Sequence, residues 1–135
     1  MINPVKLSDT LVVSTQAELA DFAPLAAQGF KVVVCNRPDG ETADQPATAA
    51  VRQAVEAAGM AFVDYPITPA IFPGDDLAKL GRLFDGSEGK VFAFCRTGTR
   101  CTNLWVASRS AAEREAAVAH AKTLGYDLTL AEKFN

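Results

Sequence analysis

A cysteine follows a short apolar run and opens a loop that carries two arginines. The segment is Phe94-Cys95-Arg96-Thr97-Gly98-Thr99-Arg100, and the residues after it have a helical pattern. Successive loop N–H groups and a helix N-terminus can point at one place, where negative charge is then favoured. The same field, with Arg96 and Arg100 nearby, should lower the pKa of Cys95 and stabilise its thiolate. Because a thiolate beside an anion site suits covalent group transfer, we predict that Cys95 is the catalytic nucleophile.

The other loop residues have predicted roles around this nucleophile. Arg100 closes the loop, and its planar guanidinium can hold two oxygens of an anion at once, so we expect it to take part in catalysis. Arg96 either sets the charge at the rim of the site or is a solvated surface side chain. The residues expected to bind the anion are Arg96, Thr97, Gly98 and Thr99.

Strands alternate with helices along the chain, which favours a mostly parallel sheet flanked by helices. The predicted fold class is therefore α/β, in a single domain over residues 1–135, because no repeat or linker divides the sequence. Pro24 should split or restart the first helix, and Asp75 should cap a later one. The expected strands are 7–13, interrupted at Ser8-Asp9, 31–35, 60–65 and 90–94, and the expected helices are 17–28, 47–58, 75–84, 101–110 and 112–124.

Three segments should meet at one edge of this sheet. Ligands of parallel sheets gather beyond the carboxyl ends of the strands, and Cys95 follows a strand there. Loop 36–46 follows a second strand, and the proline-rich loop 66–74 follows a third. Arg37 lies on this predicted rim, where it either binds the substrate or is simply part of the turn Arg37-Pro38-Asp39-Gly40.

Two further cysteines could approach the nucleophile. Cys101 lies directly after Arg100, and a loop that wraps around an anion brings its two ends together. Cys35 ends a predicted strand, and it reaches Cys95 if the two strands are neighbours, since adjacent strands lie about 5 Å apart. We therefore favour Cys35 slightly over Cys101 as a thiol that resolves an oxidised Cys95, with packing as the alternative role for both.

Composition limits the function classes. A net charge of −3 over 135 residues gives no sign of a nucleic-acid surface, and no apolar run is long enough for a membrane span. The first residues lack the apolar core of a signal peptide, and three cysteines make no disulfide framework, which favours a cytoplasmic protein. The single histidine, His120, is expected on a helix surface, and Trp105 is expected in the core. The sequence predicts no metal site and no cofactor.

The cysteine loop resembles that of the beta-lactamase-hydrolase-like, phosphatase-like domain family. Other landmarks in the order of that family are Leu7-Ser8-Asp9, Ser14-Thr15-Gln16, Gly29-Phe30-Lys31, Asn36-Arg37-Pro38-Asp39-Gly40-Glu41 and Gly125-Tyr126-Asp127-Leu128. The resemblance implies a fold similar to dual-specificity protein phosphatases. It also implies relatives that are fused to metallo-hydrolase-like or persulfide-dioxygenase-like domains. One departure is Cys101, where the family usually has a small hydroxyl residue.

Two chemistries fit such a loop. By resemblance, protein-tyrosine-phosphatase loops place five residues between cysteine and arginine, whereas this chain has four, as rhodanese sulfurtransferases do. Phosphoester cleavage also needs a proton for the leaving group, and loop 66–74 contains no carboxylate. Asp64, just before it, is a possible general acid. Transfer between thiols needs no acid, so we rank sulfur transfer first and phosphoester hydrolysis second.

The two readings imply different substrates and intermediates. In sulfur transfer, Cys95 takes the outer sulfur of a small anionic, thiol or persulfide donor, and an acceptor thiol or a redox partner protein then removes it. In hydrolysis, Cys95 attacks the phosphorus of a phosphoester and water resolves the phosphocysteine. A third reading is a non-catalytic module that senses oxidants or anions through Cys95. None of the three involves nucleic acid or a membrane.

Overall fold

The computed structural model describes residues 2–134, and across them the chain forms one five-stranded sheet. The strand order is β1-β2-β5-β3-β4. The first strand is antiparallel to the second, and all other neighbouring strands are parallel. The strands are β1 (Val5–Lys6), β2 (Leu11–Ser14), β3 (Val32–Cys35), β4 (Ala61–Asp64) and β5 (Val91–Phe94).

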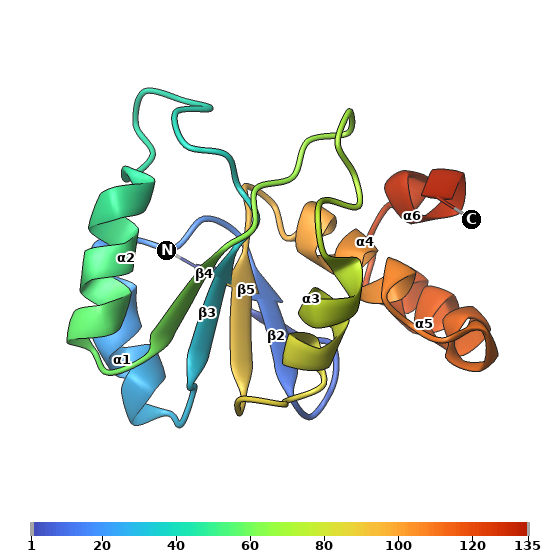
Figure 1. Ribbon diagram of the computed structural model, residues 1–135, viewed down its shortest axis with the longest axis horizontal. Coiled ribbons are helices and arrows are strands. Elements are labelled where there is room, and N and C mark those ends of the chain that lie inside the picture. The colour runs from blue at the N-terminus through green and yellow to red at the C-terminus, as the bar shows by residue number, and fades with distance from the viewer. Residues whose placement is uncertain (1, 135) are drawn as a thin grey trace.

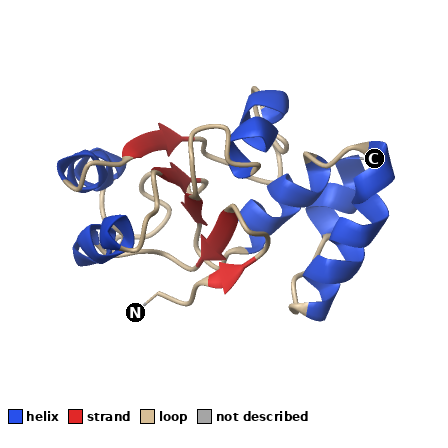
Figure 2. Cartoon of the chain, turned by 90° about the horizontal axis from the view of Figure 1, so that it is seen from below, coloured by secondary structure: helices blue, strands red, loops and turns tan. Residues whose placement is uncertain are grey.

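Helices cover both faces of this sheet (Figures 1 and 2). One face packs against α1 (Phe22–Ala27) and α2 (Thr48–Ala57), and the 3-10 helix η1 (Leu19–Asp21) contacts both of these helices. The other face packs against α3 (Leu77–Phe84) and α4 (Thr99–Ala107), while α5 (Ala111–Thr123) and α6 (Thr129–Phe134) pack against α4. Every residue of β3 and β5 is buried, because these central strands are covered on both sides. The α/β class and the mostly parallel sheet are therefore confirmed.

Some predicted boundaries are wrong in detail. The split expected near Pro24 is present: residues 17–28 form η1 and α1, with Pro24 in the first turn of α1, where its missing N–H costs nothing, but η1 begins only at Leu19. Asp75 does not cap α3; the carboxylate of Asp76 accepts the backbone N–H of Lys79 at 3.1 Å instead. Helix α4 begins at Thr99 rather than at Cys101, so Arg100 lies in its first turn. Helix α6 had no predicted counterpart.

The parallel register brings the carboxyl ends of the strands together. Cys35 pairs with Phe94 on one side and with Asp64 on the other, and Ser14 pairs with Phe94 from β2. The loops that follow β3 and β4 rise beyond the same end of the sheet, on either side of the top of β5 (Figure 1). The predicted rim is thus present.

No helix of the described chain is long and apolar enough to cross a membrane.

Candidate active site

The cysteine loop turns its backbone N–H groups inward, toward the sulfur of Cys95. Gly98 has φ of 86°, a left-handed conformation that side chains disfavour, and it ends the loop as the N-cap of α4. Its N–H donates to Cys95 Sγ at 3.1 Å. The N–H groups of Thr97, Arg100 and Cys101 also donate to this sulfur. The loop is therefore built to stabilise negative charge at one point.

The neighbours of Cys95 lower its pKa from 9.0 to about 6. The largest cause is a hydrogen bond from the side chain of Cys101, and the backbone N–H groups act in the same direction. Burial opposes them, because it disfavours a charged thiolate. The donors outweigh burial, so Cys95 is largely ionised at neutral pH. The direction of the pKa shift agrees with the thiolate expected from the sequence, but its causes are the Cys101 thiol and the loop N–H groups and not the charges of Arg96 and Arg100.

A carboxylate that the sequence analysis did not single out holds Arg100 in place. Both oxygens of Glu41 accept hydrogen bonds from the guanidinium of Arg100, at 2.9 and 3.0 Å, and the Ile67 carbonyl accepts a third at 3.1 Å. Arg100 thus joins loop 36–46 to loop 66–74. A guanidinium has five N–H groups, so two N–H groups of Arg100 remain beyond these three hydrogen bonds. A signal existed in the sequence, since Glu41 lies on the predicted rim four residues after Arg37.

Arg37 supports Glu41 from within the protein. Its side chain is about 5% exposed, and its guanidinium donates to Glu41 Oε1 at 3.0 Å. Its other two nitrogens donate to Gln16 Oε1 and Thr42 Oγ1. These three contacts lie within the protein and give no support to the prediction that Arg37 binds the anion, which stays a prediction. The two arginines keep Glu41 ionised: burial would raise its pKa, but their hydrogen bonds lower it.

The remaining loop residues differ in exposure. Arg96 and Thr97 are exposed, Thr99 is half-buried, and Gly98 is buried. Thr97 Oγ1 donates to Thr99 Oγ1 at 3.0 Å, which shapes the outer turn of the loop. Arg96 lines a polar pocket that lies between the cysteine loop and loop 36–46. The other residues around this pocket are Gln16, Glu18, Arg37, Thr42, Asp44, Gln45 and Pro46.

The two other cysteines lie on opposite faces of the sheet. Cys101 is fully buried in the first turn of α4, in the same core cluster as Cys95, and its thiol donates to the Cys95 thiolate. Cys35 belongs to the cluster on the other face, and its thiol donates to the Arg37 carbonyl at 3.4 Å. Cys35 is close in register, yet it points away, because side chains alternate along a strand. The structure therefore reverses our preference for Cys35 over Cys101.

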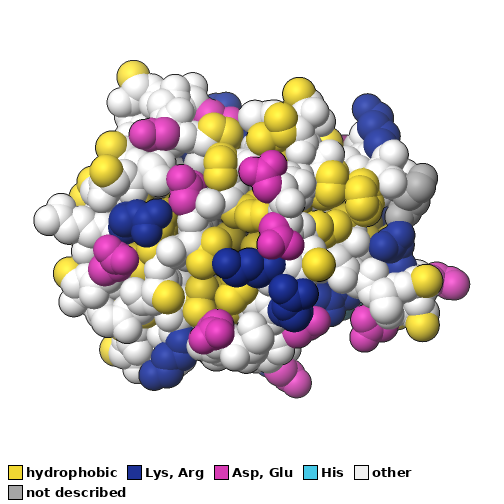
Figure 3. Space-filling view, viewed as in Figure 1, with side chains coloured by type: hydrophobic (Ala, Val, Ile, Leu, Met, Phe, Trp, Pro, Cys, Tyr) yellow, Lys and Arg dark blue, Asp and Glu magenta, His cyan; other side chains and the backbone are white. Residues whose placement is uncertain are grey.

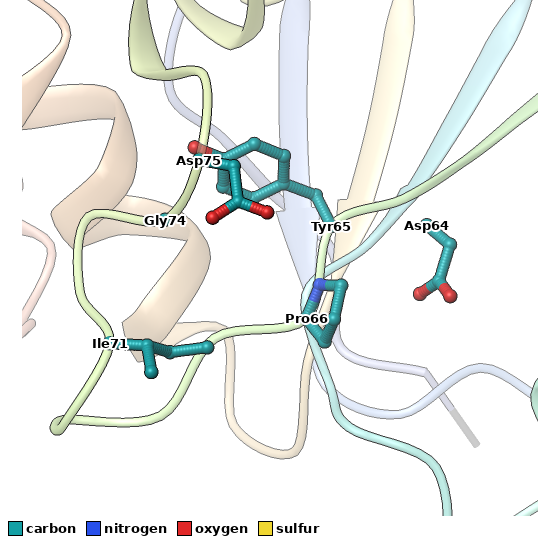
Figure 4. A pocket seen from close by; sticks show the side chains of 6 residues that line it. All are labelled: Asp64, Tyr65, Pro66, Ile71, Gly74 and Asp75. Carbon is teal, nitrogen blue, oxygen red and sulfur yellow. The ribbon is translucent and has the colours of Figure 1, made fainter.

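Asp64 does not face the cysteine loop. It is exposed at the end of the edge strand β4, and its charged neighbours are Arg52 and Asp39. Burial raises its pKa, and Arg52 acts against that rise. In Figure 4, Asp64 and Tyr65 point to opposite sides of the chain around a pocket that Pro66, Ile71, Gly74 and Asp75 complete. On the face of the molecule that Figure 3 shows, acidic and apolar side chains are interspersed. The geometry gives no support to Asp64 as the general acid.

Other candidates take no part in the site. Among residues 2–134, no group of three or more His, Cys, Asp or Glu side chains could hold a metal ion. His120 is exposed on α5, where its ring lies edge-on to buried Trp105, as expected. Asn103 is fully buried, and nothing in the sequence pattern pointed to a structural role for it. Its side-chain NH₂ donates to the Thr99 and Asp127 carbonyls, and its side-chain oxygen accepts the N–H of Ala131. Asn103 therefore connects α4 to the segment that contains α6.

Solved structures define the class of protein. The chain is similar to a presumed phosphatase from Neisseria meningitidis Z2491, with a TM-score of 0.72 and 34% identity over 93% of this chain and 90% of that one. More distant neighbours show the fold alone. Tk-PTP in its active form has a TM-score of 0.70 and 19% identity, over 93% and 87% of the two chains. TpbA from P. aeruginosa has a TM-score of 0.65 and 21% identity, over 93% and 76%. The fold is that of protein-tyrosine-phosphatase-like proteins.

The chain belongs to the family described as "Beta-lactamase hydrolase-like protein, phosphatase-like domain", whose model matches residues 5–112. It is 33% identical to the Beta-lactamase hydrolase-like protein of Agrobacterium fabrum, over 96% of this chain and 31% of that protein. The counterpart from Xylella fastidiosa is 30% identical, over 92% and 30%. The chain thus spans about a third of these relatives' length. The resemblance drawn from the sequence is confirmed, and the phosphatase alternative fits these findings better than sulfur transfer.

Proposed function

We propose that this domain is a cysteine-dependent, phosphatase-like enzyme that hydrolyses small phosphoesters through a phosphocysteine on Cys95. The observation that supports this most is the set of inward N–H groups around a buried thiolate whose pKa is about 6. Arg100, which Glu41 holds at the mouth of the loop, has two donors left for phosphoryl oxygens. The likeness to phosphatase-like proteins over nearly the whole chain supports the same chemistry.

The proposed reaction has two steps. The Cys95 sulfur attacks phosphorus, an S–P bond forms, and the bond to the ester oxygen breaks. The loop N–H groups and Arg100 stabilise the charge on the transferring group. Water then attacks the phosphocysteine, which releases phosphate and restores the thiolate.

The leaving group leaves as an anion in this proposal. Glu41 stays ionised between two arginines, Asp64 is exposed at the end of β4, and the described loop 66–74 contains no carboxylate. Without a positioned acid, the rate depends on how well the leaving oxygen bears a negative charge. Aryl phosphates therefore suit the site better than alkyl phosphates. One structure of TpbA holds pTyr, which is an aryl phosphate.

The test is turnover of a series of aryl phosphates with leaving groups of graded acidity. We expect phosphate release that falls steeply as the leaving phenol becomes less acidic, and that disappears in Cys95→Ser. Asp64→Asn should match the wild type across the series. Shallow dependence on the leaving group, together with loss of rate in Asp64→Asn, would identify Asp64 as an acid and contradict this part of the proposal.

Sulfur transfer is the second candidate, and one observation favours it specifically. The loop from Cys95 to Arg100 has only six residues, and a short loop suits a terminal sulfur more closely than a phosphoryl group with three oxygens. Intact-mass measurement after exposure to thiosulfate or a persulfide donor decides between the two. A stable gain of one sulfur on Cys95, without release of phosphate from any aryl phosphate, would overturn the hydrolase proposal. Either reaction needs a reduced thiol, which fits a reducing compartment such as the cytoplasm.

A further inference from the structure

Arg37 is a buried cation to which the proposed reaction gives no role. Its side chain is almost fully buried, and each of its three nitrogens donates to an oxygen atom of the protein. Taking a guanidinium out of water is costly unless its partners are well placed. One of these partners, Glu41, is shared with Arg100, which connects Arg37 to the anion site.

Hydrogen bonds through Arg37 close a ring that begins and ends on the cysteine loop. Near the start of this loop, the Arg96 carbonyl accepts the backbone N–H of Gln16 at 3.4 Å. The side-chain oxygen of Gln16 accepts a hydrogen bond from Arg37 at 3.0 Å, and Arg37 Nε donates to Glu41 Oε1, also at 3.0 Å. Glu41 in turn holds Arg100, at the end of the loop, at 2.9 and 3.0 Å. The Arg37 ring therefore links the two ends of the loop through residues that lie outside it.

The carboxylate of Glu41 is placed by both arginines, because its Oε1 atom accepts a hydrogen bond from each of them. About a quarter of the Glu41 side chain is exposed, so without Arg37 the carboxylate could turn toward solvent and take Arg100 with it. The charges point the same way. A carboxylate paired with Arg100 alone would cancel its charge, whereas one carboxylate between two guanidinium groups leaves one positive charge for an incoming anion.

We propose that Arg37 is a positioning residue for Arg100 and that it acts through the Glu41 carboxylate that the two arginines share. The inference rests on the proposed function, because the anion that Arg100 binds there is the phosphoryl group of the substrate. Arg37 fixes the carboxylate, and Gln16 anchors Arg37 to the start of the cysteine loop. The competing role is direct contact between Arg37 and the anion, which would not depend on Glu41.

The experiment is a double-mutant cycle between Arg37→Lys and Glu41→Ala. The readouts are the dissociation constant of tungstate, a tetrahedral oxyanion, and kcat/KM for an aryl phosphate. Lysine keeps the positive charge but cannot copy a planar fork that reaches Gln16 and Glu41 together. We expect Arg37→Lys to weaken tungstate binding about 10-fold in the wild type, and less than about 2-fold once Glu41→Ala has removed the shared carboxylate. Equal losses in both backgrounds would overturn the proposal and favour direct contact with the anion.

Two further variants keep the test decisive if Arg37→Lys fails to fold. Gln16→Ala breaks the Arg37 ring and keeps every charge, so tungstate binding should weaken roughly 3- to 10-fold. Thr42→Val removes the third partner of Arg37, which lies off the ring, and should change binding less than about 2-fold. Equal effects of the two substitutions would refute a role for the ring.

The pKa of Cys95 separates this role from a general loosening of the cysteine loop. The donors that lower this pKa belong to the loop and to Cys101, so Arg37→Lys and Gln16→Ala should leave it at about 6. A clear rise of the pKa in both variants would show that the whole loop has lost its shape, and would overturn the assignment to Arg100.

The outcomes also distinguish this inference from the proposed function, because tungstate binding and the pKa of Cys95 need no turnover. A wild type that follows the predicted cycle for tungstate but hydrolyses no aryl phosphate would refute the hydrolase and support the role of Arg37. Turnover of aryl phosphates with an additive cycle would do the reverse. A wild type that binds no tungstate would overturn the inference.

Discussion

The ionisation of Cys95 tests the site most directly, because its neighbours can be removed one at a time. Its pKa falls from 9.0 to about 6 in the folded protein, a difference of about 3 units. At 1.36 kcal/mol per unit, the surroundings favour the thiolate over the thiol by about 4 kcal/mol. The Cys101 thiol contributes the most, and the backbone N–H groups contribute the rest against the cost of burial.

Cys101→Ala removes the side-chain donor and keeps the backbone N–H. A hydrogen bond to a charged group contributes roughly 1.5–3 kcal/mol, so the pKa of Cys95 should rise by about 1 to 2 units. Cys101→Ser should keep the pKa near that of the wild type, because a hydroxyl donates as well. The assay is the ultraviolet absorbance of the thiolate against pH, with Cys95→Ser as the blank. Equal pKa values in the wild type and Cys101→Ala would refute the reasoning.

The same shift makes stability depend on pH. Because the folded pKa is depressed, the contribution is fully present above the unfolded value of 9.0 and is lost as pH falls through about 6. Between about pH 5 and about pH 8, the free energy of unfolding of the wild type should therefore rise by about 2.5 kcal/mol more than that of Cys95→Ser. Urea titrations at both pH values measure the difference. Parallel changes in the two proteins would contradict the assigned pKa.

Three more substitutions test how the loop is held. Arg100→Lys should lower kcat/KM for an aryl phosphate roughly 100-fold or more, because an ammonium cannot copy the planar fork that Glu41 holds. Glu41→Gln should cost about 10- to 100-fold in the same assay, because Arg100 loses its charged partner and its fixed orientation. Gly98→Ala should lower the free energy of unfolding by about 1–2 kcal/mol, since its φ is 86°, and should also impair turnover because its N–H is aimed at Cys95.

Matched controls make these outcomes interpretable. Arg82 is exposed on α3, away from the cysteine loop, so Arg82→Lys should keep full activity. Gly29 also has a left-handed backbone, with φ of 96°, and open space where a side chain would lie. Gly29→Ala should therefore lose similar stability while turnover is unchanged. Loss of activity in either control, or tolerance of lysine at Arg100, would count against the roles assigned here.

Much of the candidate site could be predicted because it depends on contiguous residues. A buried strand, a cysteine, a glycine with a left-handed backbone and a helix start follow one another within Phe94–Arg100, so local geometry alone directs the N–H groups toward one atom. The alternation of strands and helices likewise determined a mostly parallel sheet, and hence a shared rim for the loops after β3, β4 and β5. These features can be predicted from local sequence, without knowledge of any long-range contact.

The tertiary structure decided which side chains meet on that rim. Glu41 holds Arg100 from 59 residues away in the sequence, and the buried Arg37 donates to the same carboxylate. The sequence slightly favoured Cys35 over Cys101 as the neighbour of Cys95, but strand register and side-chain alternation put Cys35 in the core cluster on the other face and Cys101 in the same cluster as Cys95. The sequence by itself determined the cysteine loop and its candidate nucleophile, because these residues are contiguous. The fold alone decided which side chains surround them, because distant residues become neighbours only when the helices pack on the sheet.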